Sequence, residues 1–444
     1  MNKDLFTLWK TTNTKFNQDD THLKNFNLNF GPQHPASHGV LRLILQLKNE
    51  IIEKADTHIG LLHRGTEKLI ENKSYLKNLP YFDRMDYIAV LTQEHVYCLA
   101  IENLLQTKNH KMPFTQVRVI FDELTRIMNH LFAIATHALD IGCMAPVFWG
   151  FEEREKIMEL YERVSGARMH VAFYRPNDLS LNYITHELLF DILLFLKSFF
   201  KRVTMIENKL LMTSIWKYRL TNIGIFSKEF AIKWGVTGVL ARSVGLPRDI
   251  RLNFFETYAN YYYLNIRSFL GYTGDSYDRY LIRLREMVES SHIIMQIIQN
   301  LTTLDYDNDV AEPYQLEEDE DLDDLPQDLY DFLDNTSNLS LQPFKRSNQL
   351  SWYTSMEELI NHFKYFSEGI IVPKGHTYAQ VESPKGEYGV ALISDGSNVP
   401  YKCKIRTPSY YHLQLMDTMI QGSFVSDLIT IIGSQDLVMG EVDK

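Results

Sequence analysis

Cysteine is scarce in this sequence of 444 residues, which contains only Cys98, Cys143 and Cys403. No two of them form a Cys-x-x-Cys pair, so the sequence holds neither a zinc ribbon nor a run of cysteines that binds an iron–sulfur cluster. Three scattered thiols are typical of a reducing compartment, because a disulfide framework uses cysteines in pairs.

Long apolar runs are also lacking. The most apolar stretch, 188–200, is interrupted by Asp191 and Lys197, whereas a spanning helix needs roughly 20 apolar residues. Residues 1–30 have no apolar signal core and carry three acids, unlike an Arg-rich transit peptide. We therefore expect contact with a membrane only through partner proteins.

Positive charge and nucleotide loops are lacking as well. The formal net charge is −11, which disfavours nucleic acid as a partner. The sequence has no Walker loop, no Gly-x-Gly-x-x-Gly after a strand and no Gly-x-Ser-x-Gly elbow. A nucleotide site and a serine-hydrolase site are therefore not expected in this chain.

The patterns that are present predict an α+β fold with a mainly helical core and small β elements near both ends. Alternating residues predict a hairpin of strands 40–47 and 51–59, and further strands at 377–382 and 389–394. Apolar spacing and capping residues predict helices at 66–75, 83–105, 121–139, 152–164, 187–218, 277–301, 355–366 and 424–433.

These patterns divide the chain into five parts. We expect an irregular N-terminal arm over 1–29, a hairpin region over 30–65 and a helical bundle over 66–304. Residues 305–350 carry a run of acids that repels itself, which predicts a solvated, partly disordered insert, with metal binding as the alternative. Residues 351–444 are expected to form a C-terminal α/β segment.

The loop 31–40 carries His34 and His38 among two prolines and two glycines, just before the first predicted strand. Glycine and proline fix an unusual backbone path, and a rigid loop that presents imidazole suits proton donation near neutral pH. The alternative is that these histidines only hydrogen-bond to nearby carbonyl groups.

Tyr87 is the second candidate, because a tyrosine hydroxyl can donate a hydrogen bond to a ligand oxygen. We place it in the first turn of the helix 83–105, with Arg84 three residues earlier on the same face. Asp83 and Asp86 are explained as acids at the start of that helix. Arg84 pairing with one of them is the structural alternative.

Asp140 is the third candidate. Phe132, Thr136 and Asp140 are spaced four apart and therefore share one helix face. Asp140 lies near the helix C-terminus, where the dipole disfavours an anion, so it needs a partner such as a histidinium. The alternative is a carboxylate that points into water. The remaining histidines, His170 included, show no convincing metal-ligand spacing.

At this point the sequence shows a family resemblance. Residues 31–42 resemble the signature of the 49-kDa-type subunits of respiratory complex I, the NADH:ubiquinone oxidoreductase. Other segments that fit the same family are 58–68, 80–87, 123–126, 139–142, 151–170, 382–387 and 432–436. The resemblance extends over about 30–444.

The resemblance implies the fold of the large subunit of nickel–iron hydrogenases without its metal site, because this chain lacks the two Cys-x-x-Cys pairs that hold those metals. It also implies that the chain binds no cofactor alone. A neighbouring subunit would hold a 4Fe-4S cluster, ubiquinone would be the substrate, and other complex I subunits, including those of the membrane arm, would be partners.

The resemblance further implies residue roles. His38 and Tyr87 would meet the quinone headgroup, Asp140 would pair with His38, and Thr136 and Phe132 would line the cavity. The residues near the cluster would be Arg84 and His170. The position of Arg64 is methylated in some relatives.

Some positions depart from the family pattern. Asn177-Asp178 replaces a Gly-Gly pair, 254–269 fits poorly, and the acidic insert is not typical. The expected location is the matrix side of the mitochondrial inner membrane, with the cytoplasmic face of a bacterial membrane as the alternative. The alternative functions are a hydrogenase-like subunit of another donor:quinone complex and a non-catalytic scaffold.

Overall fold

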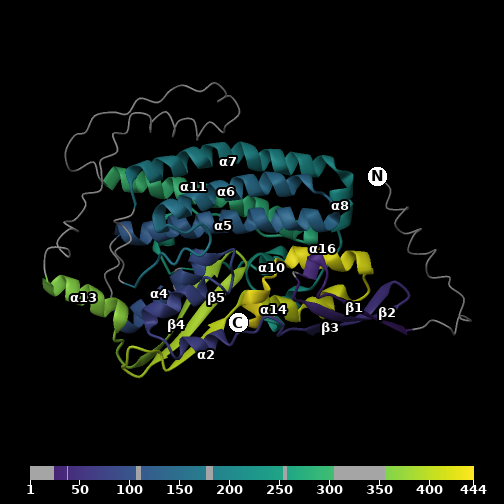
Figure 1. Ribbon diagram of the computed structural model, residues 1–444. Helices are drawn as coiled ribbons and strands as arrows, with labels where there is room; N and C mark the ends of the chain where they lie inside the picture. The colour runs from purple at the N-terminus through teal and green to yellow at the C-terminus, as the bar shows by residue number, and fades with distance from the viewer. Residues whose placement is uncertain (1–24, 38, 107–111, 177–183, 254–257, 305–355) are drawn as a thin grey trace, which may run out of the picture.

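The computed structural model describes residues 25–37, 39–106, 112–176, 184–253, 258–304 and 356–444. Long helices lie together along one side of the molecule, and two small antiparallel sheets lie beneath them, far from each other (Figure 1). This confirms the predicted α+β class. The predicted acidic insert, most of the N-terminal arm and His38 lie outside the described residues.

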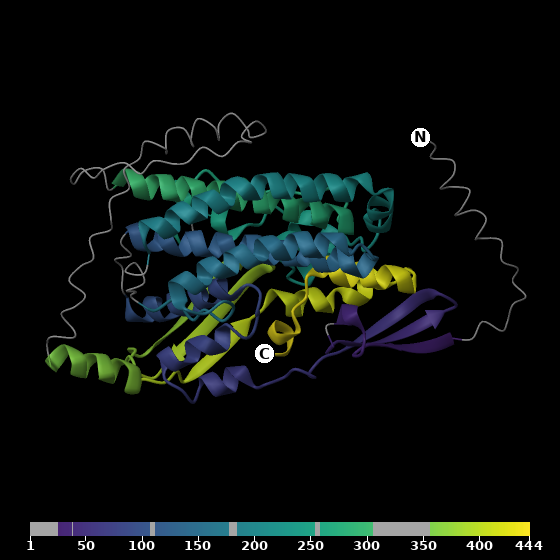
Figure 2. The ribbon, with the colours of Figure 1, turned by 45° about the horizontal axis from the view of Figure 1, so that its top comes forward.

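The bundle consists of α5 (Met112–Ile141), α6 (Ala145–Ser165), α7 (His186–Met212) and α11 (Ser276–Leu304), which run side by side in both ribbon views (Figures 1 and 2). Helix α5 contacts both α6 and α11 and lies at the centre of the main apolar core. The predicted helices 121–139, 152–164 and 277–301 are confirmed, each somewhat longer than expected.

The predicted helix 187–218 is in fact two helices, α7 and α8 (Ser214–Leu220). Thr213 between them has extended backbone angles, and its hydroxyl donates to the Leu210 carbonyl at 2.6 Å. A threonine side chain that binds the preceding turn competes with the helix ladder. This competition explains the break, which apolar spacing alone does not reveal.

The N-terminal sheet has the order β1 (Asn25–Phe30), β2 (Arg42–Lys48), β3 (Ile51–His58). The predicted hairpin is confirmed as β2 and β3. Strand β1 corrects the prediction of an irregular arm up to residue 29, because its asparagines hid an alternation that pairs with β2. On β2, Leu43, Leu45 and Leu47 face the core.

The C-terminal sheet has the order β4 (Gly375–Ser383), β5 (Gly386–Ser394), β6 (Lys402–Arg406). Two of these strands were predicted, and the short β6 was not. The predicted helices 355–366 and 424–433 are confirmed as α13 (Met356–Ser367) and α16 (Val425–Gln435). The last helix is α17 (Met439–Asp443), and the other short helices in this segment are α14 (Pro408–Gln414) and α15 (Met416–Ile420).

The segment before α4 (Val90–Leu105) differs most from prediction. Two short helices, α2 (Thr66–Ile70) and α3 (Tyr75–Phe82), replace the predicted helix 66–75, and the predicted helix 83–105 begins only at Val90. Asp83 follows the end of α3 and accepts a hydrogen bond from the distant Ala172 N–H at 3.0 Å. Tertiary contacts therefore hold 83–89 in an irregular path.

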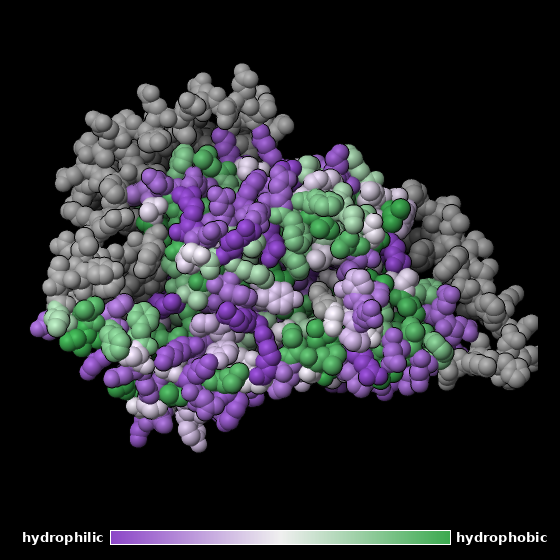
Figure 3. All heavy atoms as spheres, in the orientation of Figure 1, coloured by the Kyte–Doolittle hydropathy of each residue, from purple (hydrophilic) through white to green (hydrophobic). Residues whose placement is uncertain are grey.

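Smaller elements complete the fold. They are η1 (Pro35–Ser37), α9 (Lys228–Lys233), α10 (Gly238–Ser243), η3 (Ile250–Leu252) and η4 (Asn260–Tyr263). Hydrophobic side chains gather on the surface of α13 (Figure 3), where Met356, Phe363 and Phe366 are exposed. In the described part of the chain, no helix has the length and apolar character needed to cross a bilayer.

A buried network of charges joins the bundle to the C-terminal sheet. Arg242 on α10 donates to Glu286 of α11 at 3.0 Å and to Glu382 of β4 at 2.9 Å. Arg251 of η3 extends the network to Glu123 on α5 at 3.2 Å. Burial opposes the charge of Glu286, but Arg242, His130 and Arg251 together outweigh burial and hold the pKa of that carboxyl well below its usual range.

We expect Arg242→Ala to lower the free energy of unfolding by roughly 3–5 kcal/mol, because two acids are left buried without their cation. Thermal denaturation of the assembled complex would measure the loss. Arg285→Ala on the same α11 that holds Glu286 is the control, because that side chain is 59% exposed. Equal effects of the two substitutions would contradict this account.

Candidate functional site

Tyr87 lies in the irregular segment 83–89, and its side chain is half-buried. Asp86 holds this segment: its Oδ1 accepts from Ile88 N at 3.2 Å and from Ala89 N at 3.3 Å. Burial raises the pKa of Tyr87, and the neighbouring Asp86 carboxylate adds to this rise. The Tyr87 hydroxyl therefore stays protonated and able to donate.

The predicted helical face shared by Tyr87 and Arg84 does not exist, because both residues lie outside a helix. Arg84 is exposed and donates to the Pro80 carbonyl at 2.8 Å. It therefore does not pair with Asp83 or Asp86 through a hydrogen bond. Asp86 faces the interior, and its carboxylate binds a different cation.

That cation is Lys385, which lies in the turn between β4 and β5 and is fully buried. Its Nζ donates to Asp86 Oδ2 at 2.8 Å and to Asn129 Oδ1, and it lies 3.9 Å from Asp436 Oδ2. Burial alone would lower the pKa of Lys385, but the nearby acids, chiefly Asp436 and Asp86, outweigh burial and raise this pKa. Lys385 therefore ties together four distant parts of the chain.

Phe132, Thr136 and Asp140 lie along one face of α5, as predicted, and each is half-buried. The Thr136 hydroxyl donates to the Phe132 carbonyl at 2.9 Å, which directs this side chain along the helix. The Phe132 ring lies 5.8 Å from that of Phe151. Burial raises the pKa of Asp140 to about 6, and no neighbouring cation offsets it among the described residues.

Helix α16 brings these groups to one place. A methyl group added at Gly433 would lie 3.4 Å from Asp140 Oδ2, so the helix passes directly beside that carboxylate. One turn later, Asp436 lies close enough to raise the pKa of Tyr87. Helix α16 also contacts η1, which ends one residue before position 38. The loop, Tyr87 and Asp140 therefore converge on one helix.

The loop before position 38 has a fixed shape. Gly31 has φ +78°, and a methyl group there would lie 2.2 Å from the Leu41 carbonyl oxygen, so only glycine fits. The Ser37 hydroxyl lies 2.7 Å from the carbonyl oxygens of Pro32 and His34. The His34 ring accepts from Ala36 N at 3.1 Å, which supports the structural role for this histidine.

Arg64, Arg84 and His170 form a second group. Arg64 donates to the Arg84 carbonyl at 2.6 Å, and both guanidinium groups are exposed. Burial lowers the pKa of His170, and Arg84 and Arg64 lower it further. The structure thus brings together the two residues expected near the cluster and the candidate methylation site.

Four residues near Tyr87 and Asp86 were not predicted as candidates: Lys385, Asn129, Asp436 and Glu441. Two of them, Lys385 and Asp436, lie in segments that carry the family resemblance. Glu441 on α17 is buried and accepts from the Ser409 hydroxyl at 2.5 Å. Burial and the nearby Asp86 raise the pKa of Glu441 to about 8. No local spacing in the sequence indicates that residues 86, 385 and 441 meet.

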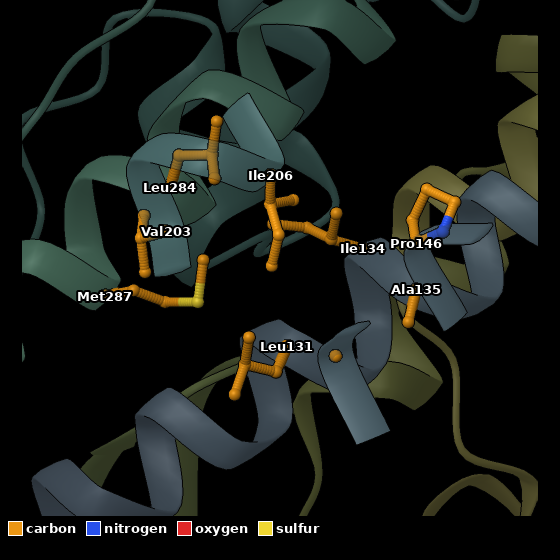
Figure 4. Close-up of a pocket in the computed structure, with 9 residues that line it drawn as sticks. Leu131, Ile134, Ala135, Pro146, Val203, Ile206, Leu284 and Met287 are labelled. Atoms are coloured by element: carbon orange, nitrogen blue, oxygen red, sulfur yellow. The ribbon is translucent and has the colours of Figure 1, made fainter. Parts of the chain in front are cut away.

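An interior cavity lies elsewhere, between α5, α6, α7 and α11 (Figure 4). Its lining is entirely apolar: Leu131, Ile134, Ala135, Pro146, Gly150, Val203, Ile206, Leu284 and Met287. A site that reduces a ligand needs polar groups to orient it and deliver protons. We interpret this cavity as imperfect packing of the bundle.

The described residues offer no metal centre. Within those ranges, no three His, Cys, Asp or Glu side chains are grouped so that they could hold a metal ion. Of the histidines, His137 is buried with its pKa lowered to about 3 by burial and by Arg283, and His63 Nδ1 lies 2.6 Å from the Asp443 carbonyl oxygen. The surroundings of these two imidazoles therefore indicate structural roles.

Comparison with known proteins decides the family. Residues 140–444 match the family described as the 49 Kd subunit of respiratory-chain NADH dehydrogenase. The "NADH-ubiquinone oxidoreductase 49 kDa subunit" of Paramecium tetraurelia is 53% identical over 422 residues, which cover 95% of this chain and all of the relative. The chain belongs to this family.

The 49 kDa family includes both mitochondrial and bacterial relatives of this chain. The protein of the same name from Reclinomonas americana is 48% identical, over 95% of this chain and 98% of its own length. An NADH-quinone oxidoreductase subunit of Orientia tsutsugamushi (strain Ikeda) is 47% identical, with the same coverage. The chain spans nearly the whole length of each relative.

Gly440→Ala tests how α17 supports the site of this 49 kDa family member. A methyl group there would lie 2.6 Å from the Met85 carbonyl oxygen, so we expect the backbone before Tyr87 to shift and quinone turnover to fall. NADH:quinone activity of the assembled complex measures this. In the control Gly375→Ala, the nearest atom is in the Leu104 side chain at 3.3 Å. Normal turnover in Gly440→Ala would contradict the proposed packing.

Proposed function

We propose that this chain forms the quinone-reduction site of complex I and takes part in passing electrons from NADH to ubiquinone. The observation that carries the proposal is the meeting of Tyr87, Asp140 and the loop before position 38 around α16. The names of the relatives, NADH-ubiquinone and NADH-quinone oxidoreductase subunits, support the reaction. Coupling to proton translocation is part of the same proposal.

Quinone reduction requires two electrons and two protons, and Tyr87 supplies the first polar contact. Its hydroxyl, kept neutral by burial and by Asp86, donates a hydrogen bond to one quinone carbonyl oxygen. In the proposal, His38 donates to the other oxygen. Hydrogen bonds aimed at the oxygens where negative charge develops stabilise the reduced states.

Asp140 serves as the counter-ion of His38 in this proposal. Its raised pKa shows that the described surroundings lack a cation for it, and an adjacent histidinium would restore the charged form. After His38 gives up its proton, Asp140 would again be uncompensated. That change of charge is the proposed start of the signal to the membrane arm. Thr136 and Phe132, on the same face of α5, line the cavity.

The group of Arg84 and His170 is proposed to face a 4Fe-4S cluster held by a neighbouring subunit. Two exposed guanidinium groups create positive potential there, which favours the reduced form of a nearby cluster, while the lowered pKa of His170 keeps its imidazole neutral at neutral pH. Arg64, which fixes the Arg84 backbone, is the proposed site of methylation. The cluster provides one-electron chemistry, while this chain positions the quinone and its protons.

The partners are other subunits of complex I. Exposed apolar side chains on α13, and Met144 and Phe148 at the start of α6, are suited to contact with such subunits. We propose peripheral attachment to the mitochondrial inner membrane on the matrix side, with the bacterial cytoplasmic face as the alternative. A bundle derived from the hydrogenase large subunit, with its metal site lost, is proposed as the origin of the cavity.

Tyr87→Phe tests the quinone contact. It removes only the hydroxyl, so we expect NADH:quinone turnover to fall by roughly 10²-fold or more while NADH still reduces the iron–sulfur clusters. The control Tyr401→Phe alters a tyrosine that is 68% exposed and directly precedes β6. Unchanged turnover and inhibitor sensitivity in Tyr87→Phe would remove Tyr87 from the mechanism.

Asp140→Asn tests the counter-ion. Without a cation the pKa of Asp140 is raised to about 6, and a charged His38 beside it would lower that pKa, so Asp140 should gain a proton and turnover should decline only as the pH falls below about 6. In Asp140→Asn, turnover should be low at every pH and this acid limb should be absent, whereas Asp140→Glu should restore part of both. A variant with the wild-type pH profile of quinone reductase activity would show that Asp140 has no such role.

A further inference from the structure

Helix α16, on which the proposed site converges, ends against two helices of the bundle. It lies beneath α5 and contacts both α5 and α11 (Figures 1 and 2). A methyl group at Gly433 would lie 2.7 Å from His137 Cδ2, so no side chain fits between α16 and α5 at this point. Just past the helix, Asp436 has φ +53° and accepts from Asn129 of α5 at 2.7 Å. The end of α16 is therefore tightly packed on α5.

Two arginines of α11 bind the same end of α16. Arg283 Nη2 donates to the Ser434 carbonyl oxygen at 2.6 Å, and Arg279 Nη1 donates to the Ser434 hydroxyl oxygen, also at 2.6 Å. Ser434 lies in the last turn of α16, where carbonyl groups have no partner within the helix. The two arginines are four residues apart, so they share one face of α11 and reach the same serine.

These arginines are buried cations without a direct ion pair. Both guanidinium groups are buried, and neither forms a salt bridge with a carboxylate in the described part of the chain. Burial lowers the pKa of both, that of Arg279 to about 9, which still leaves it charged at neutral pH. A buried cation needs compensating negative charge. The C-terminal end of a helix carries partial negative charge, and Asp436 close to Arg283 adds a full one.

The two arginines differ in what else they bind. Arg279 Nη2 also donates to the carbonyl oxygens of Gly224 and Gly274, so this residue joins α16 to two loops as well. Arg283 has one side-chain hydrogen bond within the described structure, the bond to Ser434. A change at Arg283 therefore acts on α16 more specifically than a change at Arg279.

The residues on each side of Ser434 in the chain reach the proposed site. Gly433 lies beside the Asp140 carboxylate, and Asp436 is close enough to Tyr87 to raise its pKa. Displacement of the helix end would therefore move both neighbours at once. Arg283 has no hydrogen bond to Asp140 or Tyr87 in the described structure, so its effect on them would be transmitted by α16.

We propose that Arg283 is a positioning residue of the quinone site, on which it acts by holding the end of α16. Arg279 assists it at the same serine. With the helix end held in this way, Gly433 and Asp436 form one wall of the quinone cavity, while the proton transfers stay with groups that touch the quinone. The hold on α16 rests on the described contacts, and its effect on the quinone rests on the proposed function.

Arg283→Lys and Arg283→Met test the hold on α16. Lysine keeps the charge without the planar fork of donors, and methionine removes both charge and donor. Hydrogen exchange of the assembled complex, measured by mass spectrometry on peptides from 424–438, should be faster in both variants and fastest with methionine. Arg285→Met, an exposed position on the same helix, should leave it unchanged. If the methionine variant does not assemble, the lysine variant decides. Wild-type exchange in the assembled variants would overturn the proposal.

A second measurement separates this inference from a purely structural role. The KM for a short-chain quinone, per assembled complex, should rise roughly tenfold in Arg283→Met and less in Arg283→Lys, because a displaced wall weakens quinone binding. A structural role alone would reduce the amount of assembled complex and leave this KM unchanged.

Faster exchange with an unchanged KM would retain the hold on α16 but overturn the positioning role. The effect of Tyr87→Phe on turnover tests the quinone site independently of the exchange result.

Discussion

The site depends on the contacts that the buried ammonium group of Lys385 makes with polar side chains from distant parts of the chain. It joins the turn of the C-terminal sheet to Asp86, to Asn129 in the middle of α5 and to Asp436 at the end of α16. A buried cation is tolerated only with compensating anions, so these elements must stay in register. The segment that carries Tyr87 is held by this requirement rather than by regular secondary structure.

The same region contains carboxyl groups with raised pKa values. Burial is the main cause for Asp140, Glu441, Asp83 and Glu94, whereas cations hold the pKa values of Glu286 and Asp249 low in the network around Arg242. Groups whose pKa is raised toward neutral pH suit a reaction that consumes protons. Buried acids thus have two roles within one fold: those paired with cations stabilise it, and those with raised pKa values suit proton transfer.

The sequence was sufficient for the long helices, the hairpin and the alignment of Phe132, Thr136 and Asp140, because each follows from local periodicity. It failed over 83–89, where Asp86 binds a lysine that lies 299 positions away, and over 25–29, where strand β1 forms by pairing with β2. The candidate residues came from the family resemblance and from single-residue chemistry. Lys385 and Glu441 were missed because only tertiary folding brings them near Asp86, beside Tyr87 in the chain.

The central claim is that Tyr87, Asp140 and the end of α16 border one quinone cavity. Photolabelling of the intact complex with a reactive quinone analogue, followed by peptide mapping, tests it most directly. The account predicts that label appears in residues 84–88, 132–140 and 431–437, and that a quinone-site inhibitor prevents it. Label confined to the apolar cavity around Leu131 and Met287, or absent from this chain, would contradict it.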